Sequence, residues 1–160
     1  MKTVVYPGSF DPVTLGHLDV IERASAVFGH VVVTVMINST KTPMFTPEER
    51  VALLKEATGH LDNVTIDFHK GLLTDYLRER NLNILVKGLR VISDFEAEFQ
   101  MASVNRKLLA NLETVFIMTK TEYMYLSSSI VKEVAQYGGD ISNFVTQGVQ
   151  KAIERKVGGL

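Results

Sequence analysis

The stretch Val4-Val5-Tyr6-Pro7-Gly8-Ser9-Phe10-Asp11-Pro12-Val13-Thr14-Leu15-Gly16-His17 changes its character twice. It begins as an apolar run typical of a strand, passes through a loop with two glycines and two prolines, and enters a segment of helical period. The period predicts a helix over Leu15–Phe28, with Gly29 as its stop. A strand, a loop and a helix in this order form the first half of a βαβ unit, whose second strand is parallel to the first.

The same alternation continues along the chain. Short Val- and Ile-rich runs predict five strands, at Val4–Tyr6, Val31–Ile37, Val64–Phe68, Ile84–Val86 and Val115–Met118. Capping boxes at Thr46-Pro47-Glu48-Glu49 and Ser93-Asp94-Phe95-Glu96 predict helix starts, the second helix running to about Leu109. The other predicted helices are Leu73–Arg80, Ser128–Tyr137 and Val145–Lys156. We therefore expect an α/β fold over residues 1–160: a single-domain, Rossmann-like, doubly wound parallel five-stranded sheet with C-terminal helices.

The composition is that of an ordinary globular protein, with 46% hydrophobic and 22% charged residues among 160. The absence of cysteine excludes disulfides and thiolate metal sites and favours an intracellular protein. The formal net charge is −1, without a long basic run, so we expect no nucleic-acid partner. No signal-peptide pattern opens the chain, and no apolar run reaches the ~20 residues of a membrane span. We therefore expect a cytoplasmic protein that does not bind a membrane.

The loops that follow the strands are the places to search for chemistry, because ligands of a parallel sheet bind beyond the carboxyl ends of its strands. In the first loop, Gly8 and Gly16 let a ligand approach the backbone closely. His17 falls in the first helical turn, where the helix dipole favours an anion and the ring can donate to a phosphate oxygen. Taken alone, these residues also fit an ordinary turn before a helix. The loop is neither a P-loop nor a dinucleotide-binding loop, since both glycine patterns are missing.

Two other loops bring positive charge to the same expected edge of the sheet. Lys41 follows the second predicted strand, and Lys87 and Arg90 flank Gly88 after the fourth. A single surface lysine is ordinarily only solvated, but three cations and a histidine at one edge indicate a site for a polyanion. Glu98, in the following helix, would by itself be an ordinary exposed carboxylate.

A run of serines opens a late helix, in Leu126-Ser127-Ser128-Ser129-Ile130-Val131-Lys132-Glu133. Such serines offer hydroxyl and N–H groups to a polyphosphate, although they would serve equally as an N-cap. Thr14-Leu15-Gly16-His17 resembles the T/H-x-G-H signature of the nucleotidyltransferase superfamily, and the serine run resembles its second signature, I-S-S-S/T. The resemblance to the phosphopantetheine adenylyltransferases covers essentially the whole chain and rests on four blocks in order: Y-P-G-S-F-D-P-V-T-L-G-H, K-T-P-M-F-T-P-E-E-R-V, K-G-L-R-V-I-S-D-F-E-A-E-F-Q and Y-L-S-S-S-I-V-K-E-V.

This resemblance implies transfer of the adenylyl group of ATP to 4′-phosphopantetheine, which gives dephospho-coenzyme A and pyrophosphate, the penultimate step of coenzyme A synthesis. It implies that His17 stabilises the transition state, with Lys41 and Arg90 in the catalytic set. The residues that it implies for ATP are Ser9, Phe10, His17, Gly88, Leu89, Arg90, Glu98, Tyr123, Met124, Tyr125, Leu126, Ser127, Ser128 and Ser129. Those that it implies for the acceptor are Ser9, Lys41, Leu73 and Lys87.

Two positions depart from the family pattern. Lys87 stands where arginine is common, which keeps the charge but loses bidentate recognition, so the affinity for the acceptor is expected to differ. Leu126 replaces the usual isoleucine, a packing change of little expected consequence. Because the acceptor phosphate is already an anion, its in-line attack needs alignment and charge neutralisation more than a strong base.

The resemblance further implies Mg²⁺ bound with ATP and no metal ligand assigned to the protein, together with a homohexamer and feedback inhibition by coenzyme A. One alternative is another small nucleotidyltransferase, of the nicotinamide-nucleotide adenylyltransferase or cytidylyltransferase type. A second is a non-catalytic nucleotide sensor on the same kind of sheet. The G-L-R-V-I-S-D-F-E block with Lys41 disfavours the first, and His17 with the cationic set disfavours the second.

Overall fold

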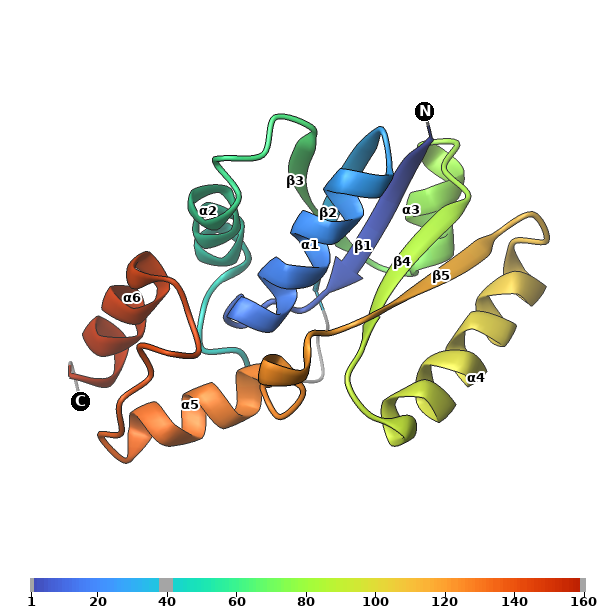
Figure 1. Cartoon of the computed structure of the whole chain (residues 1–160). Helices are drawn as coiled ribbons and strands as arrows, with labels where there is room; N and C mark the ends of the chain where they lie inside the picture. The colour runs from blue at the N-terminus through green and yellow to red at the C-terminus, as the bar shows by residue number, and fades with distance from the viewer. Residues whose placement is uncertain (1, 38–41, 159–160) are drawn as a thin grey trace.

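The computed structural model describes residues 2–37 and 42–158 and contains a five-stranded parallel sheet in the order β3-β2-β1-β4-β5 (Figure 1). Its strands are β1 (Thr3–Gly8), β2 (His30–Ile37), β3 (Val64–Lys70), β4 (Ile84–Leu89) and β5 (Glu113–Met118). In the middle of the sheet Val5 pairs with Val32 of β2 and Leu85 of β4. The predicted doubly wound α/β architecture is thereby confirmed.

Helices cover the sheet on both faces, which explains the nearly continuous apolar runs of the inner strands. They are α1 (Leu15–Val27), α2 (Pro47–Ala57), α3 (Leu73–Glu79), α4 (Ile92–Leu108), α5 (Ser128–Gln136) and α6 (Gln147–Val157), with a short 3₁₀ helix η1 (Thr121–Tyr123). On the face of α1 and α2, Val4 and Val33 belong to the larger core cluster, in which α5 and α6 also take part. On the opposite face, Val5 and Leu85 pack with Tyr76 of α3 in a second cluster. The side chains of alternate residues in one strand thus pack into two different core clusters.

The order of the strands determines where a ligand binds. β1 and β4 are neighbours in the sheet but not in the chain, because the connection through α3 crosses from β3 to the other side of β1. The crossovers on the two sides of β1 lie on opposite faces, which opens a crevice at the carboxyl ends of β1 and β4.

One of the two predicted capping boxes is confirmed and the other is wrong. Thr46 accepts from the backbone N–H of Glu49 at 3.2 Å, and the carboxylate of Glu49 accepts from the N–H of Thr46 at 2.8 Å. Ser93 caps nothing: α4 begins at Ile92, Val91 is its N-cap, and no side chain closes this helix end. The helix begins before Ser93, so Ser93 and its expected partner Glu96 both lie inside it and cannot form the predicted box, while Asp94 pairs with Arg90.

Several boundaries differ from prediction by a few residues. The last helix begins at Gln147 because Val145 is buried in the preceding loop and Thr146 is the N-cap. The helix after β3 ends one residue before Arg80, and β5 begins two residues before Val115. In the described ranges, every helix is too short or too polar to cross a bilayer.

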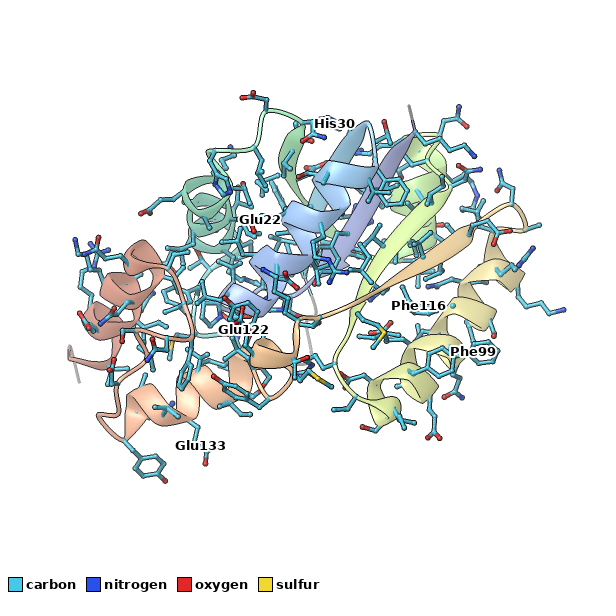
Figure 2. All side chains as sticks on the ribbon, in the orientation of Figure 1. Glu22, His30, Phe99, Phe116, Glu122 and Glu133 are labelled. Atoms are coloured by element: carbon cyan, nitrogen blue, oxygen red, sulfur yellow. The ribbon has the colours of Figure 1, made fainter. Side chains whose placement is uncertain are left out.

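The outer face of α4 carries exposed apolar side chains at the edge of the sheet, where Figure 2 labels Phe99. Phe95 packs edge-on against Phe116 of β5, 5.8 Å between ring centroids, but most of the apolar side chains of this helix remain accessible. The exposed set on α4 and β5 comprises Ile92, Phe95, Phe99, Met101, Val104, Leu108, Val115 and Met118. These side chains therefore belong to neither of the two core clusters.

Candidate functional site

A cavity of about 300 Å³ opens at the switch point between β1 and β4. The residues that line it come from the end of β1, the loop into α1, the end of β4, the first turns of α4, the residue after β5 and the start of α5; Figure 1 shows these elements on the ribbon. The lining residues are Tyr6, Pro7, Gly8, Phe10, Thr14, Gly16, His17, Val20, Lys87, Gly88, Arg90, Asp94, Ala97, Glu98, Thr119, Leu126, Ser127 and Ser128. The cavity therefore lies where the sequence places the chemistry.

Asp11 anchors the loop after β1 to two distant segments. Its carboxylate accepts the backbone N–H groups of Met44 and Phe45, both at 2.9 Å, and the ammonium of Lys132 in α5 at 3.0 Å. Burial acts to raise the pKa of Asp11, but these two N–H groups and the ammonium outweigh it and leave the pKa below its usual range. The carboxylate stays ionised and holds the loop in place.

Two further bonds fix the same loop. The buried guanidinium of Arg50, from α2, donates to the carbonyl of Ser9 at 3.0 Å. The hydroxyl of Ser128, at the start of α5, donates to the carbonyl of Pro12 at 2.7 Å. The loop is thus attached to both α2 and α5, so its position depends on the packed domain rather than on its own turn residues.

Gly8 is required because an aromatic ring packs directly on it. A Cβ added there would lie 2.9 Å from Cζ of Phe10, closer than side-chain contacts normally allow. The ring of Phe10 also lies 5.1 Å from the ring of His17 and 5.3 Å from that of Tyr6, edge-on in both cases. Phe10 thereby supports one side of the histidine.

His17 is held in one tautomer by the N-cap of its own helix. The backbone N–H of Thr14 donates to Nδ1 of His17 at 3.1 Å, and the N–H of His17 donates to the hydroxyl of Thr14 at 3.3 Å. Since Nδ1 accepts, the proton of the neutral ring is on Nε2. Burial, and secondarily the charge of Arg90, lowers the pKa of His17 from 6.5 to about 4. The cavity therefore holds a neutral imidazole with one N–H available as a donor.

The two cations that line the cavity are both paired with carboxylates of α4. Arg90 donates through Nε to Asp94 at 3.0 Å and through Nη1 to the carbonyl of Leu126 at 2.8 Å. Nζ of Lys87 lies 3.4 Å from Glu98. These pairs orient the cations and tie the start of α4 to the end of β4, and Arg90 also reaches the loop before α5.

The start of α5 uses its serine hydroxyls internally. Ser127 is the N-cap and accepts the N–H of Ile130 at 3.2 Å, while Ser128 bonds to the first loop. The N–H groups of the first helical turn have no partner inside the helix. This end of α5 can therefore offer backbone donors and the helix dipole to an anion.

The structure brings together nine of the predicted site residues around the cavity: Phe10, His17, Lys87, Gly88, Arg90, Glu98, Leu126, Ser127 and Ser128. Seven others lie outside its lining: Ser9, Leu73, Leu89, Tyr123, Met124, Tyr125 and Ser129. Of these, Leu73 packs against the core cluster of α3, and Tyr125 packs edge-on against Phe144, 6.1 Å between ring centroids. Lys41 lies outside the described residues.

Sequence reasoning missed several residues that build the site. The sequence motif makes Asp94 only a member of a predicted capping box, although its spacing of four from Arg90 is also a signal of an ion pair. Asp11, Arg50 and Lys132 carry no such local signal. Arg50 reaches Ser9 across 41 residues of sequence and Lys132 reaches Asp11 across 121, so only the folded chain shows these contacts.

Comparisons with known proteins identify the family of the chain. The cytidylyltransferase-like family model matches residues 5–134. The phosphopantetheine adenylyltransferase of Alkaliphilus metalliredigens is 53% identical over 156 residues, covering 98% of this chain and 99% of the relative. That of Heliobacterium modesticaldum is 48% identical over 158 residues, covering 99% and 94%. A crystal structure from Vibrio parahaemolyticus, described as a nicotinate-nucleotide adenylyltransferase, shares the fold with a TM-score of 0.69 at 21% identity, covering 96% of this chain and 99% of that one. The chain belongs to the phosphopantetheine adenylyltransferase family of cytidylyltransferase-like nucleotidyltransferases.

Proposed function

We propose that this protein transfers the adenylyl group of ATP to 4′-phosphopantetheine, which releases dephospho-coenzyme A and pyrophosphate. The observation that carries the proposal is the cavity at the switch point, in which a neutral histidine, two oriented cations and a helix start converge. The relatives that carry this activity in their names match the chain almost from end to end. We take residues 1–160 to act as one nucleotidyltransferase domain.

In the proposed reaction, a phosphate oxygen of the acceptor attacks the α-phosphorus of ATP in line. The new P–O bond forms as the bond from the α-phosphorus to the bridging oxygen of the β-phosphate breaks, and pyrophosphate leaves with that electron pair. No proton has to be removed from the nucleophile, because a phosphate is already an anion at neutral pH. The residues therefore act by alignment and by stabilising charge.

His17 is proposed to stabilise the transition state through Nε2–H. A neutral imidazole can donate this proton to an oxygen of the α-phosphate without giving it up. Thr14 holds the other ring nitrogen, so the ring is oriented before the substrate arrives. A donor oriented in advance stabilises developing charge without a cost of reorganisation at the moment of reaction.

The cations are proposed to hold the phosphates. Arg90 and Lys87 line the cavity, and we propose that Arg90 contacts ATP and that Lys87 contacts the acceptor phosphate. Lys41 is proposed for the same acceptor phosphate. We propose that ATP is also contacted by Ser9, Phe10, Gly88, Leu89, Glu98 and residues 123–129. We propose that the acceptor is also contacted by Ser9 and Leu73.

Mg²⁺ is proposed to enter with ATP. Within the part of the chain that the structure describes, no group of three His, Asp or Glu side chains forms a metal site. Mg²⁺ commonly keeps several waters and binds the phosphates of its substrate, with one or two carboxylates at most. Asp94 and Glu98 are the carboxylates of the cavity, and both already pair with cations. The metal would neutralise phosphate charge.

A homohexamer is proposed as the assembled form, with the exposed apolar face of α4 and β5 as one subunit interface. Contiguous exposed apolar surface of this kind is typical of interfaces. Phe99→Asp should reduce the particle mass in sedimentation, and an unchanged mass would exclude this face.

We also propose feedback inhibition by coenzyme A and a cytoplasmic location. The absence of cysteine fits a reducing compartment.

Pyrophosphate release from ATP and Mg²⁺, with and without 4′-phosphopantetheine, tests the function. His17→Ala should lower kcat about 10²-fold or more and change ATP binding little, because the lost hydrogen bond strengthens in the transition state. His60→Ala is the control, since His60 is exposed and bonds only Glu22 among the described residues. Unchanged kcat with a large loss of ATP affinity would reject this role of His17. Activity with nicotinamide mononucleotide or with CTP, and none with phosphopantetheine, would change the substrate but not the family.

A further inference from the structure

Helix α1 carries, beyond His17, side chains that reach the segment after β5. One carboxylate oxygen of Asp19 accepts the backbone N–H of Lys120 at 3.1 Å. One turn later, Arg23 donates to the carbonyl of Met118, at the end of β5. Positions i and i+4 of one helix face thus bind the backbone on both sides of Thr119.

The environment of Asp19 is unusual for a carboxylate. The residue is 3% exposed, and its second oxygen, Oδ1, has no hydrogen-bond donor among the described residues. The ammonium of Lys120 lies 3.4 Å from that oxygen, and the guanidinium of Arg23 lies 3.7 Å from the other. Burial of an incompletely paired carboxylate costs stability. An unsatisfied buried group of this kind calls for an explanation other than stability.

The segment held by Asp19 forms one side of the cavity. Thr119 lines the cavity directly, and the chain then passes through η1 to the start of α5, where Leu126, Ser127 and Ser128 line it again. This segment also packs closely on the helix of His17. A Cβ added at Gly16 would lie 3.6 Å from Cβ of Tyr123 and 3.9 Å from Cγ2 of Thr119.

We propose that Asp19 is a positioning residue, which sets the segment 119–127 relative to His17 by holding the backbone N–H of Lys120. The role rests on the proposed function, in which this segment contacts ATP. Asp19 does not line the cavity, so in the proposed function it acts through the segment rather than by contact with ATP. It acts by joining, through one helix, the segment proposed for the nucleotide to the histidine proposed for the α-phosphate.

This role predicts a specific pattern of losses. Asp19→Ala should weaken binding of ATP about tenfold, the effect of losing one hydrogen bond to a charged acceptor that holds the segment. The KM for ATP should rise by a similar factor, while kcat and the KM for phosphopantetheine stay within about twofold, because the interaction supports ground state and transition state alike. A carboxylate with only a structural role would lower stability and leave these affinities unchanged.

The variants separate the backbone bond from the charge. Asp19→Asn keeps an acceptor for the N–H of Lys120 and should retain more ATP affinity than Asp19→Ala. Lys120→Met removes the ammonium but leaves the backbone N–H, so its affinity should stay within about twofold of wild type. Glu22→Gln removes a carboxylate from the same helix, at the position labelled in Figure 2, and Ile153→Val lowers stability in the distant α6. Neither control should change the affinity for ATP.

Titration calorimetry with ATP and Mg²⁺, without acceptor, measures the affinity directly, and melting temperatures are recorded for every variant. Reduced affinity in Asp19→Ala, less reduced in Asp19→Asn, supports the role. Equal affinity in wild type and Asp19→Ala overturns it, and so does a loss in Lys120→Met as large as that in Asp19→Ala. If Asp19→Ala does not fold, Asp19→Leu, which also removes the acceptor for the N–H of Lys120, carries the test against Ile153→Val at matched stability. Absence of nucleotide binding by the wild-type protein would instead overturn the proposed function.

Discussion

Lowering the pH from 7 to 4 should destabilise the wild-type protein more than a His17→Gln variant. In the folded protein burial, with a smaller contribution from Arg90, lowers the pKa of His17 from 6.5 to about 4. In the unfolded chain the same imidazole titrates near its ordinary value. Between the two values the unfolded chain binds a proton that the folded chain does not. The stability that the neutral His17 contributes is therefore fully present above about pH 6.5 and is lost as the pH falls toward 4.

The size of the effect follows from the size of the shift. One pKa unit corresponds to about 1.4 kcal/mol, so the shift of His17 corresponds to at most about 3 kcal/mol. His17 keeps part of its surface on the cavity, so screening by solvent reduces this to about 2 kcal/mol. Gln at the same N3 position can still accept from Thr14, so the variant keeps the capping box and loses only the titrating ring.

Urea unfolding of both proteins at several pH values between 7 and 4 measures the difference in unfolding free energy. The imidazole resonances of the four histidines give a second readout, because the one missing in His17→Gln belongs to His17. The chemical shift of that resonance should titrate with a midpoint near pH 4. A midpoint at or above 6.5, or parallel pH curves for the two proteins, would refute both the burial argument and the assignment of a neutral ring in the cavity.

Three other substitutions test the construction of the site. Asp11→Asn should lower the unfolding free energy by about 1.5–3 kcal/mol in thermal or urea unfolding, because Lys132 loses its charged partner; unchanged stability would contradict the anchoring role. Gly88→Ala should weaken ATP binding in calorimetry and cost about 1–3 kcal/mol of stability, since the new Cβ would lie 2.9 Å from Cγ2 of Val20; wild-type affinity would show that this wall can move. Lys87→Arg should lower the KM for phosphopantetheine a few-fold, because guanidinium binds phosphate through two donors, whereas a raised KM would mean that the pairing with Glu98 requires lysine.

Much of the fold could be predicted because its causes are local. The strands are apolar runs, and Thr46 and Glu49 lie within one helical turn of each other, so their capping box is a property of a few adjacent residues. The same local reasoning fails at Ser93. There the helix begins at Ile92, so Ser93 and Glu96 lie inside it and cannot form the predicted box, while Asp94 pairs with the guanidinium of Arg90.

The sequence by itself determined the alternation of strands and helices, the edge of the sheet at which the site lies, and the residues His17, Lys87 and Arg90 within it, because each of these follows from short-range pattern or motif. Only the tertiary structure decided which partners those residues have. Three contacts join segments that are distant in sequence or lie on different elements: the pairing of Lys87 with Glu98, that of Lys132 in α5 with Asp11, and the bond that the N–H of Lys120 donates to the buried Asp19. Such contacts depend on how the elements pack. Packing sets the distances that let the carboxylate of Asp11 bind distant donors, and it sets the desolvation that keeps His17 neutral.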